Sequence, residues 1–277
     1  TMIFRAGKKN EFMEPYSQDG SVYAVYNSSR VKGKLPFTCS TEDHALITNI
    51  DPQALRANNS VLKTLRLALS CNGEYANCFG ATSSLQSGLV LAAFNATMTR
   101  VNGVFEKDFS ARMVLIANND LVVYTNASTD PYSAASQMSQ WNAQLQSTLT
   151  SVIGEANYDI GHLFGASGGG GNAGCIGCVC VNGSKGKGIT SPADNIPSGD
   201  NFDIDYVAHE MGHQFGGNHT FTQSNEGTGV QMEPGSGSTI MGYAGITSLD
   251  VQPHSDPIFH AVSIQQITNN IKSKTCP

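Results

Sequence analysis

The pattern of apolar and polar residues in the middle of the chain predicts strands that alternate with long helices. Residues 64–71 read TLRLALSC, with apolar side chains at alternate positions, which is the period of a half-buried strand. Residues 84–109 form a segment long enough for a helix, and residues 133–154 favour a second helix. Short apolar runs at 112–117 and 121–125 predict two further strands between these helices.

The rest of the chain adds two helical patterns and one strand. Residues 201–215, NFDIDYVAHEMGHQF, have one apolar face and one polar face when they are drawn as a helix. The apolar face comprises Phe202, Ile204, Val207, Met211 and Phe215. Residues 263–271 predict a helix near the C-terminus, and residues 21–29 alternate like a strand. The mixture of strands and helices predicts an α+β fold.

Composition and charge exclude two classes of partner. The 277 residues are 14% charged, with a formal net charge of −6 and no basic stripe, so we expect no nucleic-acid partner. No apolar run approaches the roughly 20 residues that span a bilayer, so we expect no membrane partner. The first residues, TMIFRAGKKNEF, lack the apolar core of a signal peptide, and any export signal is expected to have been removed already. The oligomeric state has no signature in the sequence.

The cysteines favour a secreted, extracellular protein. Several of the seven are closely spaced, as in CNGEYANC and CIGCVC. This usage fits disulfide bonds in an oxidising compartment better than the cytosol, although a thiol metal cluster remains an alternative.

The segment HEMGHQFGGNH, His209–His219, has the spacing of a zinc site. On a helix, His209 and His213 lie one turn apart on the same face and can offer two imidazole nitrogens to one ion. His219 can reach that ion only if the helix ends first, which Gly216 allows because glycine adopts the left-handed conformation. Three imidazoles with one open position are typical of a catalytic zinc site. Glu210 lies beside the ion without binding it, and is the candidate general base.

The extended motif resembles the signature of the metzincin clan of zinc endopeptidases, which continues with a methionine-containing turn. Here GSTIMGYAG supplies that turn, and the resemblance places Met241 as the hydrophobic floor beneath the metal. Tyr243 stands where astacin-like and serralysin-like members carry a tyrosine that approaches the zinc or the transition state. The segment is most similar to the reprolysin (adamalysin-like) branch, especially its bacterial secreted members. Animal-type members usually have an aspartate after the third histidine, where this chain has Thr220, so the subfamily stays open.

The resemblance covers roughly residues 62–277 and implies a catalytic domain with a mixed twisted sheet, a long zinc-binding helix and a Met-turn. It also implies that residues 157–164 form the edge strand above the active-site cleft, where an extended substrate pairs its backbone. His162 in that segment is expected at the surface. The glycine-rich residues 165–174 are expected to form a flexible loop beside the edge strand.

The function implied is a secreted endopeptidase that hydrolyses peptide bonds with a zinc-bound water and Glu210 as general base. The partner is a protein or peptide substrate, and the cofactor is one catalytic Zn²⁺. Two alternatives are an inactive zinc-bearing binding or adhesion module and a zinc hydrolase of a non-peptide bond. A calcium ion is undetermined, because residues 191–203 offer several oxygen ligands without the spacing of a known calcium loop.

Residues 1–61 precede what the resemblance requires, and we interpret them as a prodomain remnant, which would make the chain a zymogen. Cys71 with Cys78, and the other four C-terminal cysteines among themselves, can form three disulfides and leave Cys39 in a loop-like segment. A thiolate is a strong zinc ligand, so Cys39 is a candidate latency switch that fills the open zinc position, as in several metzincin prodomains. Alternatively, Cys39 is simply unpaired, or it pairs with Cys276 and one cysteine of CIGCVC stays free.

Overall fold

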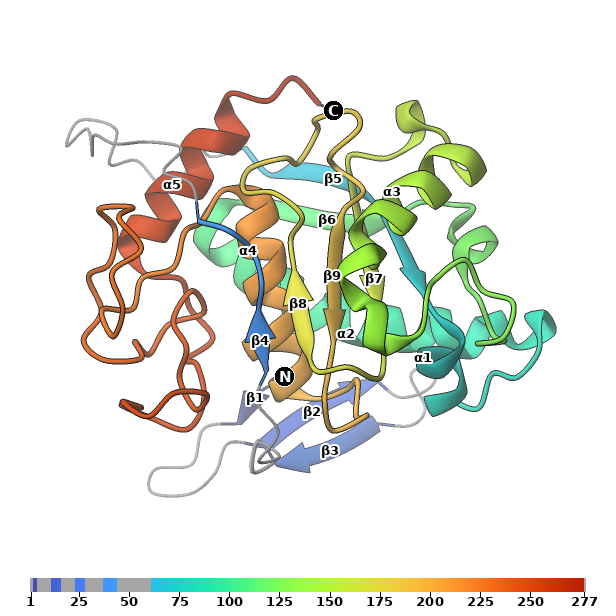
Figure 1. Ribbon diagram of the computed structural model, residues 1–277, viewed down its shortest axis with the longest axis horizontal. Coiled ribbons are helices and arrows are strands. Elements are labelled where there is room, and N and C mark those ends of the chain that lie inside the picture. The colour runs from blue at the N-terminus through green and yellow to red at the C-terminus, as the bar shows by residue number, and fades with distance from the viewer. Residues whose placement is uncertain (1, 4–10, 16–22, 28–36, 44–60, 277) are drawn as a thin grey trace.

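A six-stranded mixed sheet with helices on both faces forms the body of the protein in the computed structural model (Figure 1). The structure describes residues 2–3, 11–15, 23–27, 37–43 and 61–276. The strands of the large sheet, in spatial order, are β4 (Thr38–Cys39), β8 (Gly170–Asn172), β9 (Gly188–Ser191), β7 (Ile160–Phe164), β5 (Lys63–Cys71) and β6 (Ala111–Leu115). A separate antiparallel sheet contains β1 (Met2–Ile3), β2 (Glu11–Pro15) and β3 (Tyr23–Asn27).

The helices follow the sequence pattern closely. The α-helices are α1 (Gly73–Cys78), α2 (Ser87–Phe109), α3 (Trp141–Val152), α4 (His209–Phe215) and α5 (Ala261–Lys272). The 3₁₀ segments are η2 (Ser84–Gln86), η3 (Asn119–Val122), η4 (Ala135–Gln140) and η5 (Glu155–Asn157), and η6 (Asn201–Ala208) is a π-helical segment that runs directly into α4. No helix in the described part of the chain is long and apolar enough to cross a bilayer.

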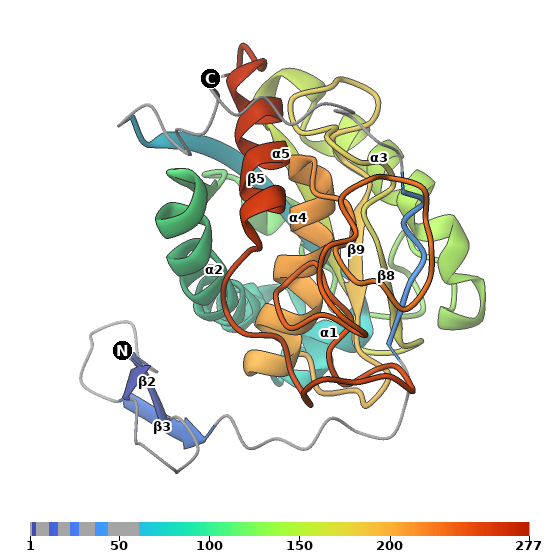
Figure 2. The same cartoon turned by 90° about the vertical axis from the view of Figure 1, so that its left-hand side faces the viewer.

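The alternation in β5 explains how one sheet buries two faces. Its three leucines, Leu65, Leu67 and Leu69, join the core that contains α2, η6 and α4. Ala68 faces the other way, into a second core with Trp141 and other residues of α3. Figure 2 shows α2 and α4 together on one side of the sheet and α3 on the other. The α+β fold, with its mixed sheet, confirms the prediction.

The strand predicted at 121–125 is wrong. Residues 119–122 form η3 instead, and Val123 makes only an isolated bridge to Cys71. The cause is Asn119, whose side-chain amide accepts from the Leu69 N–H (2.9 Å) and donates to the Leu69 carbonyl (2.8 Å). The side chain thus satisfies the β5 backbone at a point where a strand would otherwise pair.

The edge strand was also placed wrongly. Residues 160–164 form β7, which lies inside the sheet between β5 and β9. The edge strands are β4 and β6, and β8 in the glycine-rich segment lies between β4 and β9. His162 is fully buried rather than at the surface, with Nδ1 2.7 Å from Gln214 Oε1 and Nε2 2.8 Å from Thr190 Oγ1. The glycines of residues 165–174 carry no side chains that could alternate between apolar and polar, so the sequence of β8 resembled a loop.

Two disulfides are present among the described cysteines, Cys175–Cys178 and Cys180–Cys276. Cys71 and Cys78 are free, so the pairing expected between them is wrong. The reason is that the Cys71 thiol faces the Tyr124 carbonyl at 3.6 Å, whereas the exposed Cys78 thiol faces the Asn195 carbonyl at 3.8 Å. The two thiols have different neighbours.

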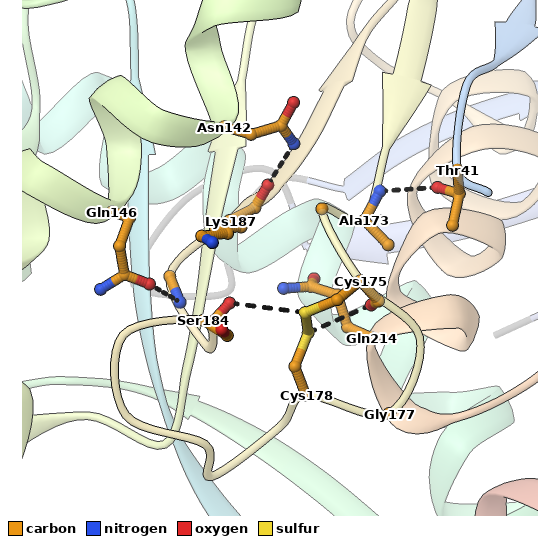
Figure 3. The surroundings of a disulfide bond; sticks show 12 residues. Thr41, Asn142, Gln146, Ala173, Cys175, Gly177, Cys178, Ser184, Lys187 and Gln214 are labelled. Atoms are coloured by element: carbon orange, nitrogen blue, oxygen red, sulfur yellow. Dashed lines mark hydrogen bonds between the residues drawn. A yellow bond between two sulfur atoms is a disulfide. The ribbon is translucent and has the colours of Figure 1, made fainter. Parts of the chain in front are cut away.

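The cysteine-rich loop around the first disulfide, drawn in Figure 3, supports the end of α4. The Gly177 N–H donates to the His213 carbonyl (2.9 Å), and the Val179 N–H donates to the Gln214 carbonyl (3.1 Å). These carbonyls lie in the last turn of the helix, where the regular i→i−4 hydrogen bonds run out. The loop therefore fixes the helix that carries two of the predicted zinc ligands.

Candidate metal centre

The end of α4 brings the third histidine back to the first two. Gly216 adopts a φ of 116° and closes the helix, with its N–H bonded to the carbonyls of Gly212 and His213. Only glycine takes this conformation without strain. The chain then reverses, so that His219 faces His209 and His213 instead of continuing along the helix axis. The sequence prediction for Gly216 is confirmed.

The three imidazoles converge on one point. His219 Nε2 lies 3.1 Å from His213 Nε2 and 3.3 Å from His209 Nε2. Zinc ligands about 2.0–2.1 Å from the ion lie about 3.3 Å apart at tetrahedral angles, so this spacing fits a single zinc ion. All three rings are buried.

Each ring is oriented through its other nitrogen. His209 Nδ1 donates to the Ile240 carbonyl and His213 Nδ1 donates to the Gly217 carbonyl, both at 2.7 Å. His219 Nδ1 lies 3.0 Å from two carboxylates, Asp43 Oδ2 and Glu226 Oε2. Such outer partners fix the tautomer that leaves Nε2 free for a metal.

Burial keeps two of the imidazoles neutral. It lowers the pKa of His213 to about 3 and lowers the pKa of His209 well below its usual value. For His219 burial also acts to lower the pKa, but the hydrogen bonds to Asp43 and Cys39 outweigh it and raise the pKa. The adjacent carboxylates make this ring the most basic of the three, which strengthens it as a ligand.

Glu210 lies beside the converging nitrogens without joining them. Its side chain is fully buried, and among the described residues Oε1 has no hydrogen-bond partner. Burial raises the pKa of Glu210 to about 7, so the carboxyl can exchange a proton near neutral pH. Gly171 of β8 packs directly against it, and a Cβ at that position would overlap the Glu210 carboxyl.

The turn around Met241 packs closely against α4. Met241 is fully buried, and a Cβ on Gly212 would come within 2.6 Å of its sulfur, so glycine is what lets the turn approach α4. The Tyr243 ring lies 4.7 Å from the His219 ring and 5.7 Å from the His209 ring, measured between centroids. Burial raises the pKa of Tyr243, which therefore stays protonated.

A short segment from the N-terminal part of the chain lies across this centre. Residues 37–43 run parallel to β8, with Thr38 paired to Gly170 and Cys39 to Gly171. Cys39 is therefore in strand β4 and not in a loop, and its thiol is free. Every second residue points inward. The inward residues are Phe37, Cys39, Thr41 and Asp43.

Each inward side chain meets a different part of the site. The sulfur of Cys39 lies 3.6 Å from His213 Nε2, and it lies within 4.8 Å of the nearest nitrogens of all three histidines. The hydroxyl of Thr41 donates to Glu210 Oε2 (3.1 Å) and accepts from the Ala173 N–H (2.8 Å). Burial and the nearby Glu210 carboxylate raise the pKa of the Cys39 thiol.

Two further contacts complete this set. Asp43 approaches the His219 imidazole and also accepts from the Asn218 amide at 3.1 Å. Phe37 stacks face to face on Tyr206, with ring centroids 4.0 Å apart. The sequence reasoning missed Thr41, Asp43 and Glu226. The alternation of FTCSTED was the available signal for the first two.

The stretch considered for calcium uses its carboxylates elsewhere. Asp200 forms an ion pair with Arg100 at 2.8 Å, and Asp203 accepts from the Thr97 hydroxyl at 2.8 Å.

Comparison with known proteins places the chain among metallopeptidases. The model of the reprolysin-like metallopeptidase family M12B matches residues 61–273. No curated protein matches the chain. Among solved structures, the chain is similar to metalloproteinase II from Bacteroides fragilis, with 12% identity and a TM-score of 0.45. That similarity covers 91% of this chain and 63% of the other, so this chain spans less than two thirds of the length of that protein.

Proposed function

We propose that this chain, which belongs to the reprolysin-like metallopeptidase family M12B, is a secreted endopeptidase whose zinc ion is held by His209, His213 and His219. The observation that carries the proposal is the convergence of the three Nε2 atoms, 3.1 and 3.3 Å apart, beside the buried carboxyl of Glu210. A binding module needs no such base, which argues against an inactive zinc-bearing adhesion protein. The two disulfides support an oxidising, extracellular location.

The chain's own residues have separate roles in this proposal. A zinc ion in this site supplies Lewis acidity, which polarises the scissile carbonyl and lowers the pKa of a water molecule toward neutrality. Glu210 accepts the proton of that water and then delivers it to the leaving amine. Met241 packs against Gly212 of the helix that carries His209 and His213, and Tyr243, whose ring lies beside those of His209 and His219, would donate a hydrogen bond to the carbonyl oxygen as negative charge develops on it.

We place the substrate backbone along the edge of β8 that β4 covers in this structure. At present the Thr38 N–H donates to the Gly169 carbonyl (3.3 Å) and the Ser40 N–H donates to the Gly171 carbonyl (2.9 Å). An extended peptide can pair with the same carbonyls once β4 has left, which is strand addition to a sheet edge. This mode favours a protein or peptide substrate over a small non-peptide one.

The N-terminal residues 1–61 serve as an inhibitory prodomain in this proposal, and residues 62–277 form the catalytic domain. Cys39 lies where a fourth zinc ligand would lie, so its thiolate would fill the position that the reactive water needs. Strand β4 also occupies the substrate edge of β8. The intact chain is therefore expected to be latent until the extension is removed.

Hydrolysis of casein or gelatin tests the proposed activity. The zinc-loaded chain is assayed after limited tryptic cleavage, for which Arg56 offers a site, with and without 1,10-phenanthroline. We expect turnover that the chelator abolishes. Glu210→Ala should keep its zinc and its fold but lose nearly all turnover, whereas Glu106→Ala, at a surface pair with Arg112, should behave as the parent. Parent-like hydrolysis by Glu210→Ala would exclude the assigned base.

Cys39→Ala tests the latency proposal in the intact chain. Loss of the thiol should raise peptide turnover before any cleavage, because the open zinc position becomes available to water. The same variant should be indistinguishable from the parent after the extension has been removed. If the intact variant is as latent as its parent, Cys39 is not the switch.

A further inference from the structure

The residue directly after the third histidine is hydrogen-bonded to a carboxylate from a later loop. Thr220 follows His219, and its hydroxyl donates to Glu233 Oε2. Glu233 comes from a later loop, fourteen residues beyond His219 in the sequence. It is 6% exposed, so this hydrogen bond is protected from water.

Both oxygens of Glu233 are fully used. Oε1 accepts from the backbone N–H groups of Ser238 (2.9 Å) and Thr239 (3.0 Å). Oε2 accepts from the hydroxyls of Thr220 and of Thr239, the latter at 2.6 Å. A buried carboxylate with several donors stays ionised, and these hydrogen bonds lower the pKa of Glu233 even though burial alone would raise it.

The two groups of donors lead to two different histidines. Thr220 is bonded covalently to His219. Thr239 directly precedes Ile240, whose carbonyl orients His209 through Nδ1 at 2.7 Å. The Thr220 N–H also donates to the Met241 carbonyl (3.1 Å), which gives a second contact between the segment after His219 and the segment that contains Thr239 and Ile240.

Further backbone contacts anchor Glu233 itself. Its N–H donates to the Thr220 carbonyl at 2.8 Å, and the residue forms an isolated parallel bridge with Phe221. Glu233 is thus held both at its backbone and at its carboxylate. A rigid group in this position can transmit its geometry to the segments that it joins.

We propose that Glu233 is a positioning residue that sets the distance between His209 and His219 and so prepares the histidines for the metal. It touches neither histidine, and it acts through Thr220 on one side and through Thr239 and Ile240 on the other. The inference rests on the proposed zinc site. In this proposal Glu233, which lies in a loop, joins the segment that carries His219 to the turn around Met241. The residue directly after His219 is a threonine, so the carboxylate comes from this loop instead.

Zinc affinity measured by chelator competition tests the proposal independently of turnover. Removing a group that hydrogen-bonds directly to a metal ligand typically weakens binding by about 10–100-fold, and because Glu233 acts one residue further away, Glu233→Ala is expected at the lower end, about tenfold. Replacing zinc by Co²⁺ gives a second readout, because the visible absorption of Co²⁺ reports the ligand geometry. Glu233→Ala should shift and broaden that spectrum.

Two milder variants keep the test decisive if Glu233→Ala folds poorly. In Glu233→Gln the oxygen can keep the two backbone donors, and the amide can donate to the two hydroxyls, which rotate to accept. This variant should therefore rescue most of the affinity. Thr220→Val removes one hydrogen bond on the His219 side and should weaken zinc binding by a smaller factor than Glu233→Ala.

Asp159→Ala is the matched control. Asp159 is also buried, and it accepts from the backbone and guanidinium of Arg66, which is in β5, away from the metal centre. Its loss should lower the stability of the fold without changing the zinc dissociation constant or the Co²⁺ spectrum. If Glu233→Ala behaves in the same way as Asp159→Ala, the positioning role is overturned. A parent chain that binds no zinc would instead overturn the proposed function, and this inference with it.

Discussion

Replacing Thr41 by valine removes the contact between the N-terminal segment and the proposed base while keeping the shape of the side chain. The Thr41 hydroxyl donates to Glu210 Oε2 at 3.1 Å and accepts from the Ala173 N–H at 2.8 Å. Valine can make neither hydrogen bond. When the segment dissociates, water satisfies both Glu210 and the Ala173 N–H, so the substitution disfavours only the docked state.

The size of the effect follows from these two hydrogen bonds. Each contributes a net of about 0.5–1.5 kcal/mol, so the docked segment loses about 1–3 kcal/mol. That loss shifts the equilibrium between docked and released segment by about 5–150-fold. The turnover of the intact Thr41→Val chain should rise by the same factor, up to the rate of the cleaved enzyme.

The assay compares hydrolysis of a fluorogenic peptide by the zinc-loaded chain before and after tryptic removal of the extension. The ratio of the two rates measures latency, and Thr41→Val should reduce it. Thr38→Val is the control, because Thr38 is in the same segment but its side chain is exposed on the opposite face. Equal ratios for the two variants would refute the role of Thr41, and a parent that is fully active before cleavage would refute inhibition by the segment.

Three further predictions concern the stability and the shape of the site. Burial lowers the pKa of His162 to about 4, below the unfolded-state value of about 6.5, so the unfolded chain takes up the proton first as the pH falls. The His162 contribution to the free energy of unfolding is complete above about pH 6.5 and declines toward pH 4, and urea titrations of His162→Phe should show a shallower pH dependence than the parent. Gly171→Ala should push Glu210 aside and lower kcat at least tenfold without unfolding the chain. Gly103→Ala is the control and should leave kcat unchanged, because Gly103 has open space around it. Equal kcat values for the two variants would contradict the close packing of Gly171 against Glu210. Cys276→Ser opens a disulfide with a sequence separation of 96 and should lower the free energy of unfolding by up to about 5 kcal/mol in urea titrations, and an unchanged midpoint would show that the bond does not form.

The sequence predicted the part of the site that is built from local geometry. His209, His213 and Gly216 follow from helix periodicity and from the conformational freedom of glycine, and their positions agree with the structure. The helices at 84–109 and 263–271 were predicted for the same reason, because their apolar faces repeat within the segment itself.

The parts that were missed depend on residues far apart in the chain. Asp43, which precedes His219 by 176 residues, and Glu226, which follows it by 7, both approach His219 Nδ1, and neither belongs to a recognisable motif. Strand β8, which pairs with β4 next to the edge of the sheet, was missed because it is mostly glycine, and glycine gives no apolar alternation. The Cys71–Cys78 pairing failed because proximity in sequence does not fix the direction of two thiols.

The alternate spacing of Phe37, Cys39, Thr41 and Asp43 makes the segment sensitive to insertion and deletion. Because successive side chains of an extended strand point to opposite faces, adding or removing one residue between Phe37 and Cys39 cannot be accommodated by a local adjustment. Either Phe37 keeps its stack on Tyr206 and the thiol turns to solvent, or Cys39 keeps its place and the aromatic contact is lost. A substitution weakens one contact, whereas an insertion or deletion of one residue reverses the facing of all the side chains beyond it and breaks several contacts together. Related chains that conserve this mode of docking should therefore vary in residue identity here while keeping the segment length constant.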